Sequence, residues 1–231
     1  TIGTTNILPE RSVHASLGVE QRLPYNLDVE VTGFYKWASN IVVSNPASFT
    51  DDTVEPYLND GTGRIYGAEF LMRFAPISSV SGWLSYSYQK SFRRDGPDEE
   101  ERVFDLDQPH ILTMVGTWKI NESWSVGSRF RYVTGNSWTP IEQTVYASDS
   151  DIYVPIYGET NSERFSPFVQ LDVRVDKTWI FETWKLNLYL DVQNATNRGN
   201  QEGWAYQFDY QARQPQTGLP ILPIIGVNAS W

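Results

Sequence analysis

Histidine, the side chain most often used for acid–base catalysis and zinc binding, occurs only twice, at His14 and His110. The two residues lie far apart in the sequence, and neither has an acidic partner at metal-ligand spacing. Cysteine is absent, which excludes thiol nucleophiles, disulfides, Cys-based zinc sites and iron–sulfur clusters. We therefore expect no enzymatic activity, no catalytic or metal-binding residue and no cofactor.

Carboxylates gather in a polar stretch at residues 95–101, which contains Asp95, Asp98, Glu99, Glu100 and Glu101. Oxygen ligands of this kind can hold a divalent cation, but an acidic run is also typical of a solvated loop tip. The sequence leaves cation binding there open. Closely spaced acids at 105 and 107, and at 149 and 151, resemble glycosidase pairs, yet such pairs are common in loops and predict no catalysis.

Aromatic side chains in two other polar stretches are better candidates for a binding site. Trp138 and Tyr153 lie in residues 134–165, and Trp204 and Tyr206 lie in residues 195–220. Aromatic rings can stack on a sugar or on an aromatic chelator, so these four residues are our candidate ligand contacts. The alternative is strand extension, because aromatic residues between 204 and 210 alternate with other types.

Composition narrows the class of protein that could carry such a site. The chain has 231 residues and a formal net charge of -10, with no basic stripe, so nucleic acid is not an expected partner. Residues 1–9 lack the basic and apolar regions of a signal peptide, so we expect a mature chain or a fragment. No run approaches the roughly 18 apolar residues of a membrane-spanning helix. This excludes helical membrane proteins but leaves β-barrels open.

Alternation of apolar and polar residues recurs about nine times in segments of about ten residues, which predicts an all-β chain. The clearest segment is 184–194, and the one before it covers 169–176. A two-residue turn at Phe181-Glu182 would place Val175 opposite Leu188 and Trp179 opposite Trp184, and it would bring the apolar faces together. The same alternation is expected near residues 16–20, 27–32, 69–74, 84–89, 112–119, 124–132 and 225–231.

Charges on the polar face of these two segments predict a cluster of Asp172, Arg174 and Asp191. In the expected register Arg174 neighbours Asp172 on its own strand and lies diagonal to Asp191 on the next. Opposite charges placed in this way stabilise a sheet. A structural role in the sheet is the first interpretation, and a surface that docks another polypeptide segment or conducts substrate is the alternative.

Connections between the strands are sorted by length. Short turns are expected at 24–26, at 75–79, at 120–122 and at 181–182, and long polar stretches at 45–63, 93–109, 134–165 and 195–220. Outer-membrane barrels have short periplasmic turns at one rim and long extracellular loops at the other. Tryptophan next to the short turns fits an interfacial aromatic girdle, and its members are Trp118, Trp124, Trp179, Trp184 and Trp231.

Several segments resemble TonB-dependent outer-membrane receptors. They are Leu188–Arg198, the ending Gly218–Trp231, Tyr66–Glu69, Gln108–His110 and Arg129–Gly135 followed by Pro140, and they occur in the order of that family. The resemblance implies a barrel of about 22 strands with a plugged lumen. It also implies active import of a scarce ligand, such as a siderophore, cobalamin or saccharide, with energy from the TonB system.

This chain departs from the family pattern because it has only about nine expected strands and no plug domain. We interpret residues 1–231 as the C-terminal portion of an antiparallel up-and-down transmembrane β-barrel. The expected partners are the remaining N-terminal strands and plug, in the same or a separate chain, TonB through the missing plug, outer-membrane lipid and lipopolysaccharide, and a small-molecule or saccharide ligand. The alternatives are a passive, porin-like barrel and a soluble β-sandwich that binds or hydrolyses carbohydrate.

The C-terminal segment resembles the signal by which outer-membrane barrels are recognised for assembly. Its alternating residues are Ile225, Val227, Ala229 and Trp231. The resemblance places the chain in the bacterial outer membrane, with short turns periplasmic and long loops extracellular.

Overall fold

The computed structural model describes residues 6–51, 53–77 and 79–231. Nearly all regular structure is β-strand, and the short 3-10 helix η1 (Pro46–Phe49) lies in the first long connection. No helix among these residues has the length and hydropathy needed to cross a membrane. The expectation of an all-β chain is confirmed.

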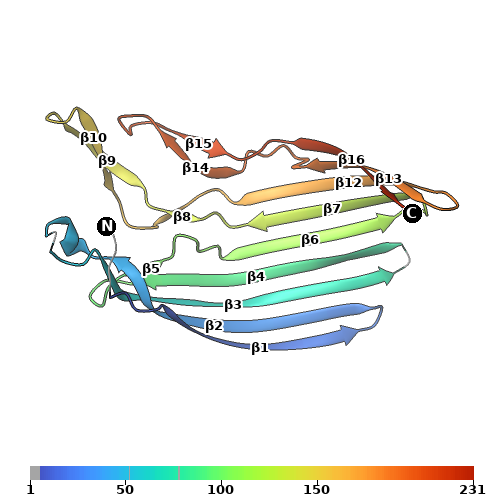
Figure 1. The fold of residues 1–231 in the computed structure, drawn as a ribbon, viewed down its shortest axis with the longest axis horizontal. Coiled ribbons are helices and arrows are strands. Elements are labelled where there is room, and N and C mark those ends of the chain that lie inside the picture. The colour runs from blue at the N-terminus through green and yellow to red at the C-terminus, as the bar shows by residue number, and fades with distance from the viewer. Residues whose placement is uncertain (1–5, 52, 78) are drawn as a thin grey trace.

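One antiparallel sheet dominates the structure, and each of its strands pairs with the preceding one on the path (Figure 1). The order β1-β2-β3-β4-β6-β7-β12-β13-β16 gives the expected nine strands, and the short β5 (Arg102–Val103) pairs beside β4. The nine are β1 (Arg11–Leu23), β2 (Leu27–Ser44), β3 (Tyr57–Ile77), β4 (Val80–Arg94), β6 (His110–Lys119), β7 (Trp124–Val133), β12 (Phe168–Ile180), β13 (Lys185–Gln193) and β16 (Leu222–Ser230).

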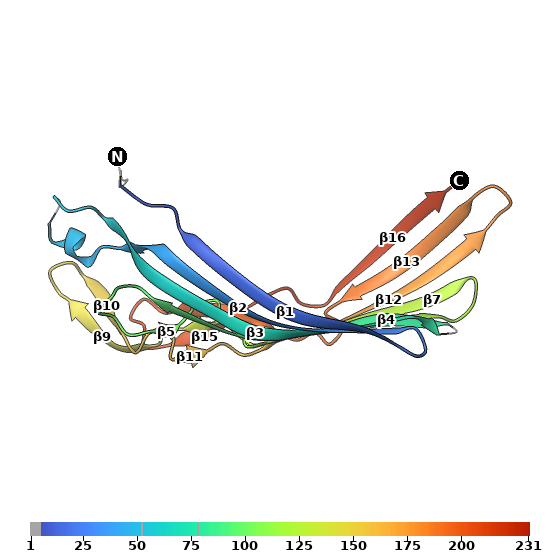
Figure 2. The same ribbon diagram turned by 90° about the horizontal axis from the view of Figure 1, so that it is seen from below.

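The sheet curves strongly without closing, as Figure 2 shows. Strands β1 and β16 end the pairing path, so within the described residues each has an edge with no strand beside it. The surface is correspondingly large, at 15719 Å², whereas a compact monomer of this mass exposes about 10,700 Å². The structure therefore corresponds to part of a barrel wall, and it does not correspond to a β-sandwich.

Apolar residues of all nine strands share one face, which we call the apolar face. The register pairs Val31 with Phe70, and Phe70 with Tyr86. It continues from Leu171 to Phe130 on the neighbouring strand. Among the described residues only Val43 and Val133 are buried apolar side chains. The apolar face therefore does not form the core of this chain; its side chains remain available to lipid.

The turn between β12 and β13 is longer than the sequence suggests. It contains four residues, 181–184, in which the Phe181 and Trp184 rings stack at 4.4 Å and the Phe181 N–H donates to the Trp184 carbonyl at 2.9 Å. Val175 consequently pairs with Leu190, and Trp179 pairs with Leu186. The expected pairs were wrong by two residues, but a shift of two keeps every side chain on its face.

The other short turns lie at the same end of the sheet (Figure 1). Residues 24–26 join β1 to β2, and Tyr25 and Asn26 adopt the positive φ angles that such a tight hairpin requires. The turn expected at residues 75–79 is shorter, because Ile77 already pairs with Val80; Ser78 lies outside the described residues. The expected sorting of short and long connections is confirmed.

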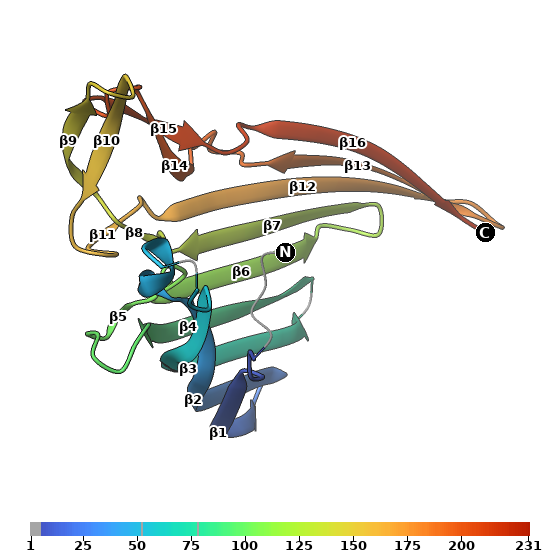
Figure 3. The same ribbon diagram turned by 60° about the vertical axis from the view of Figure 1, so that its left-hand side comes forward.

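Long connections at the opposite end carry strands of their own. These are β8 (Ser137–Trp138), β9 (Ile141–Ala147), β10 (Ile152–Tyr157), β11 (Glu163–Arg164), β14 (Gln201–Tyr206) and β15 (Arg213–Thr217). β9 pairs with β10, and β14 pairs with β15. Figure 3 shows the two hairpins together beyond the ends of the main strands.

Candidate functional site

A buried ion pair joins the second and third long connections at the end of the sheet. Asp107 has a fully buried side chain, and one of its carboxylate oxygens accepts a hydrogen bond from the Ser91 backbone N–H at 2.7 Å. Its other carboxylate oxygen binds Arg164, which also donates to the Gly135 carbonyl at 3.2 Å. This pair fixes residues that are far apart in the sequence at one point of the rim.

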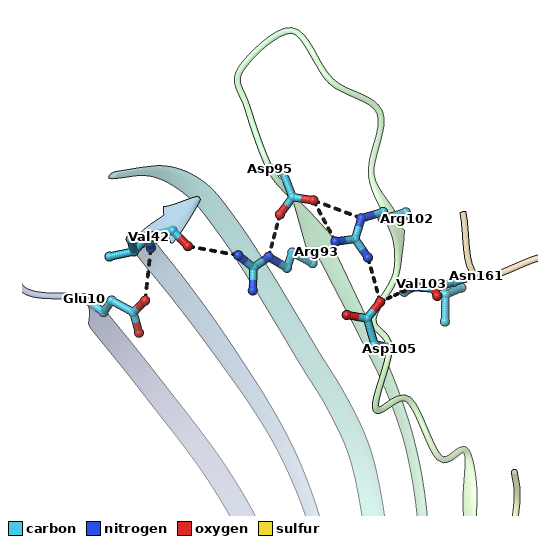
Figure 4. A network of polar contacts seen from close by, with 8 residues as sticks. All are labelled: Glu10, Val42, Arg93, Asp95, Arg102, Val103, Asp105 and Asn161. Carbon is cyan, nitrogen blue, oxygen red and sulfur yellow. Dashed lines mark hydrogen bonds and ion pairs between the residues drawn. The ribbon is translucent and has the colours of Figure 1, made fainter. Parts of the chain in front are cut away.

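A second polar network extends across the same rim (Figure 4). Asp95 accepts hydrogen bonds from Arg93 at 2.6 Å and from Arg102 at 2.7 Å. Arg102 also reaches Asp105 at 3.1 Å, and the Asn161 side chain of the third connection donates to Asp105 at 2.5 Å. The loop that follows β4 is thereby tied back to its own strand and to the neighbouring connection.

Electrostatics in this network favour ionised Asp95. Burial acts to raise the pKa of the Asp95 carboxyl, but hydrogen bonds and charge from Arg102 and Arg93 outweigh it, so the pKa lies below its ordinary value. Burial acts in the same way against the charged form of Arg102, and Asp95 reverses the effect, so the pKa of Arg102 is raised. Among the described residues, no group of three or more His, Asp or Glu side chains has the arrangement of a metal site.

Three of the four candidate ligand contacts, Trp138, Trp204 and Tyr153, lie in two aromatic groups at the long-loop end. Trp138 and Trp204 face each other with ring centroids 5.9 Å apart, and the Arg213 guanidinium lies 4.7 Å and 4.2 Å from their respective rings. Tyr153 contacts Tyr146 at 5.1 Å and, across the two hairpins, Phe208 at 5.6 Å. These contacts join the third and fourth long connections.

Two observations decide how these aromatic residues can act. The Trp204 indole N–H is buried without a hydrogen-bond partner within the described residues, whereas Tyr206 contacts only Tyr210, at 5.7 Å, among the aromatic rings. The contact between Trp138 and Trp204 packs the third long connection against the fourth. The alternative of strand extension describes Trp204 and Tyr206, which lie in β14. It was wrong for Phe208 and Tyr210, which lie in the turn that follows.

A cavity of about 450 Å³ lies at the rim where β1 to β4 end. Charged side chains on its lining include Lys36 and Arg93, and apolar ones include Ile65 and Phe104. Mixed apolar and convergent polar lining is typical of small-molecule sites. The residues that line this cavity lie between positions 10 and 104, and they include none of the residues of the two aromatic groups.

Polar-face charges are paired differently from the expected cluster. Asp172 accepts two hydrogen bonds from Arg129 of β7, at 2.6 and 2.8 Å. It also accepts one from the Gln170 side chain at 2.7 Å and one from the Asn194 backbone at 2.9 Å. Asp172 and Arg174 are neighbours on one strand and one face, as expected, but the ion-pair partner of Asp172 is Arg129, which lies directly opposite it.

Arg174 instead binds Asp176, the next residue on its face, at 2.8 and 2.9 Å. Its guanidinium also lies 3.8 Å from the Tyr189 ring. Asp191 is directly opposite Arg174 rather than diagonal to it, and no ion pair within the described residues includes Asp191. The polar face therefore carries a series of ion pairs, and Asp191 is in none of those formed by the described residues.

The C-terminal residues lie as the alternation predicts. Ile225 and Val227 are on the apolar face of β16, opposite Leu190 and Leu188 of β13. Ala229 continues this face, and Trp231 follows the strand with 97% of its surface exposed.

Sequence reasoning missed the contacts made by Arg129, Asn161 and Arg164. Arg129 could have been found from the register of β7 against β12, since it shares the polar face with Asp172. The other two depend on contacts 56 and 57 residues apart in the sequence, and no local pattern signals them. The structure also reveals a second aromatic belt, at the long-loop end of the apolar face, which includes Tyr35, Tyr66 and Tyr88.

Comparison with known proteins identifies a family and a fold. The family described as "TonB dependent receptor-like, beta-barrel" matches residues 1–195. A search of curated proteins finds no match.

Solved structures that resemble the chain are outer-membrane import proteins. They include the ferric-catecholate import receptor Fiu of Escherichia coli K12 (15% identity, TM-score 0.65, 99% of this chain and 28% of that chain). The others reported are the ferripyoverdine receptor FpvA of Pseudomonas aeruginosa (13%, 0.65, 96% and 27%) and the iron transporter FrpB of Neisseria meningitidis (14%, 0.64, 97% and 32%). The chain spans less than a third of the length of each, and identities this low establish the fold alone.

Proposed function

The chain belongs to the TonB-dependent receptor β-barrel family, and from this premise we propose that it forms part of an active-transport receptor that imports a scarce ligand with energy from the TonB system. Barrels of this family are outer-membrane proteins. The observation that carries the proposal is the sorting of its connections. All long connections, with their aromatic groups and polar networks, gather at one rim of a wall whose apolar face is continuous.

We place the short turns in the periplasm and the long loops outside the cell. The ligand would meet the loop end first, where Trp138, Tyr153, Trp204 and Tyr206 are the proposed aromatic contacts. Siderophore complexes are favoured as ligand because similar structures are described as import receptors for iron complexes. Cobalamin and saccharides remain candidate ligands, because aromatic side chains can stack on them as well.

Completion of the receptor requires further polypeptide. Unpaired strand edges are not tolerated in lipid, because each unsatisfied backbone group costs several kcal/mol there. We propose that remaining barrel strands pair with β1 and β16, that a plug domain fills the lumen, and that TonB acts through the plug. The polar-face charges Asp172, Arg174 and Asp191 would then belong to the inner wall, where Asp191 is available to a plug residue.

The C-terminal residues Ile225, Val227, Ala229 and Trp231 are proposed as the assembly signal. Their apolar face and the exposed terminal indole suit recognition by the machinery that folds outer-membrane barrels. Removal of Trp231 should lower the amount of heat-modifiable barrel in the outer membrane.

Energised uptake tests the main proposal. Cells that contain the full receptor should accumulate a labelled ferric siderophore, cobalamin or saccharide from a panel, and uptake should cease when TonB is deleted or the proton gradient is collapsed. Uptake that continues unchanged in both conditions would identify a passive, porin-like barrel. Failure of every ligand to bind would contradict a receptor role.

A further inference from the structure

A second cavity, of about 320 Å³, lies on the polar face where the second, third and fourth long connections meet the sheet. The ends of β7 and β12 contribute Arg131 and Phe168 to its lining, and the connections contribute most of its wall. Phe165 is part of that wall, and its ring stacks on Trp138 with the centroids 5.7 Å apart. The cavity therefore adjoins one of the proposed aromatic ligand contacts.

The wall of this cavity is held in place by the buried ion pair of Asp107 and Arg164. Arg164 donates hydrogen bonds to the Asp107 and Gly135 carbonyls, at 2.5 and 3.2 Å, and Gly135 lines the cavity. A Cβ atom at Gly135 would lie 2.0 Å from the Phe165 carbonyl oxygen, so only glycine lets the two ends of the third connection approach this closely. The cavity is therefore preformed, as small-molecule sites usually are.

Arg131 brings to the cavity a positive charge that has no acidic neighbour on the sheet. The residues directly opposite it are Thr113 on β6 and Gln170 on β12, and both are uncharged. Arg129, two residues earlier on the same face, instead lies opposite Asp172 and forms an ion pair with it. No ion pair formed by the described residues includes Arg131. Its charge is therefore available to an anion in the cavity.

Hydrogen-bond donors in the cavity accompany this charge. The Arg131 guanidinium lies over the Phe168 ring, 5.3 Å from its centroid. A cation–π contact of this kind uses no N–H hydrogen bond, so the donors of the guanidinium remain available. One N–H of the Gln108 carboxamide donates to the Asn136 side chain at 2.8 Å, and a carboxamide has a second N–H. The lining thus combines one cation with a neutral donor.

The one acidic residue on the lining does not neutralise Arg131. Glu202 lines the cavity, but none of the ion pairs formed by the described residues includes it. One of its carboxylate oxygens lies 2.4 Å from the position that a Cβ atom at Gly218 would take. Glu202 is therefore directed against the backbone of Gly218 rather than onto Arg131.

We propose that Arg131 binds a carboxylate of the imported ligand in this cavity, so that the receptor selects ligands with a free carboxylate. This inference rests on the proposed function and narrows its ligand class. A guanidinium matches a carboxylate through two parallel hydrogen bonds. One cation suits the single charge of a carboxylate, whereas a phosphate monoester carries about 1.5 to 2 negative charges at neutral pH. Carboxylate-bearing siderophores and acidic saccharides are therefore favoured over cobalamin, whose side chains end in amides.

The experiment measures binding to the purified full-length receptor in detergent by isothermal titration calorimetry. The probes are two matched pairs that differ only in their free carboxylates. One pair is the ferric complex of 2,3-dihydroxybenzoylserine and that of its carboxamide, and the other is trigalacturonate and its methyl ester. The test variant Arg131→Gln removes the charge, and Arg131→Lys keeps the charge but not the planar fork.

Arg73→Gln is the matched control at the other end of the same face. Arg73 is exposed on β3 near the short turns, opposite Asp28 and Trp83, and it does not line the cavity. Like Arg131, it takes part in none of the ion pairs formed by the described residues. Heat-modified gel mobility verifies that each variant is folded.

The wild-type receptor should bind the carboxylate member of at least one pair about tenfold more tightly than the uncharged member. Arg131→Gln should abolish this preference and leave the affinity for the uncharged member unchanged, Arg131→Lys should retain part of it, and Arg73→Gln should retain it fully. Equal affinities within both pairs, or no binding of either carboxylate probe, would overturn the proposal. Equal weakening of both members in Arg131→Gln, or loss of the preference in Arg73→Gln, would overturn it too.

Energised uptake in cells separates this proposal from the proposed function. A receptor that shows the Arg131-dependent preference but imports neither carboxylate probe would contradict only the proposed function. A receptor that imports cobalamin or an uncharged probe, at the same rate in the wild type and in Arg131→Gln, would contradict only the carboxylate site.

Discussion

At the residue scale, the Asp107–Arg164 pair is the contact whose removal should cost most. Arg164→Met would leave the buried Asp107 carboxylate without its cation, which typically costs about 3 kcal/mol. We expect a loss of this size in the unfolding free energy of the receptor, measured by urea titration. Arg198→Met is the matched control, because within the described residues the Arg198 side chain makes a single, long hydrogen bond of 3.4 Å, to the Pro167 carbonyl. Equal losses in the two variants would contradict the importance of the buried pair.

The stability of the loop after β4 should depend on pH, because Asp95 holds this loop through its ionised carboxylate. Its folded pKa lies below the ordinary value of about 3.9, so its contribution to stability is present above pH 4 and is lost as the pH falls through the folded pKa. These 231 residues contain no cysteine, so in a receptor whose other segments carry no cysteine a nitroxide at Asp98→Cys would report on this loop alone. The spin label should be immobile at neutral pH and become mobile as the pH falls through the lowered folded pKa of Asp95.

The variant Asp95→Asn provides the control for that measurement. It removes the titrating group and weakens the hydrogen bonds from Arg93 and Arg102, so the label at position 98 should be mobile at every pH. In the parent protein, a label whose mobility stays the same as the pH falls from 7 until the receptor itself unfolds would contradict the role of Asp95.

The proposed ligand contacts can also be tested one residue at a time. Replacing Trp204 by alanine removes a ring from the group formed with Trp138 and Arg213, and loss of one aromatic contact should weaken ligand binding by about tenfold. Phe49→Ala is the control, because Phe49 is exposed in the first long connection, away from these rings. Titration of the purified receptor with the imported ligand provides the measurement, and identical dissociation constants for both variants would exclude Trp204 from the site.

At the scale of the strand, β4 offers a matched pair of substitutions for the lipid-facing assignment. Leu84 lies on the apolar face opposite Met114, four residues beyond Val80, which is opposite Trp118 of the girdle, and Ser85 lies on the polar face. Four residues of a strand tilted by about 40° rise about 10 Å, close to half of the apolar band of about 25 Å. Arginine near the midplane of the lipid face costs about 2 to 4 kcal/mol. Leu84→Arg should therefore destabilise the folded barrel in vesicles by this amount. Ser85→Arg should destabilise it much less. Similar losses of stability in the two variants would refute the assignment of Leu84 to the lipid face and of Ser85 to the polar face.

Leu188 illustrates why height matters as well as face. It lies on the apolar face, but it is opposite Lys177, whose other neighbour is Trp124 in the girdle. Arginine near the interface costs only about 0 to 1 kcal/mol. We therefore expect Leu188→Arg to be tolerated better than Leu84→Arg, in the same folding measurement.

Strand patterns predicted the faces but not the exact pairing. Alternation has a period of two, so it specifies the register of β12 and β13 only to within a shift of two residues, and the length of the 181–184 turn decided the rest. The same ambiguity explains why Asp191 was expected diagonal to Arg174 and is found directly opposite it. At the site, Asp107 and Arg164 could not be paired from the sequence, since tertiary folding of two loops brings them together.

At the scale of the whole molecule, the two open edges of the sheet, at β1 and β16, determine how the rest of the receptor must pair with this chain. Leu17 and Val19 of β1 are largely exposed, as are Ile225 and Val227 of β16. Long, apolar edge strands invite pairing with another strand. Their backbone groups would be unsatisfied in lipid if no strand lay beside them. Both edges should therefore be hydrogen-bonded to other strands in the assembled receptor.

Hydrogen exchange measures this pairing directly. In the full receptor, amides on the outer edges of β1 and β16 should be protected as strongly as those of the central strands β4 and β6, because each would donate to a neighbouring strand. Residues 141–157 of the β9–β10 hairpin are the internal reference for fast exchange, since that hairpin lies outside the main sheet. Fast exchange along β1 or β16 in the full receptor would show an edge that remains open, and would contradict closure of the wall into a barrel.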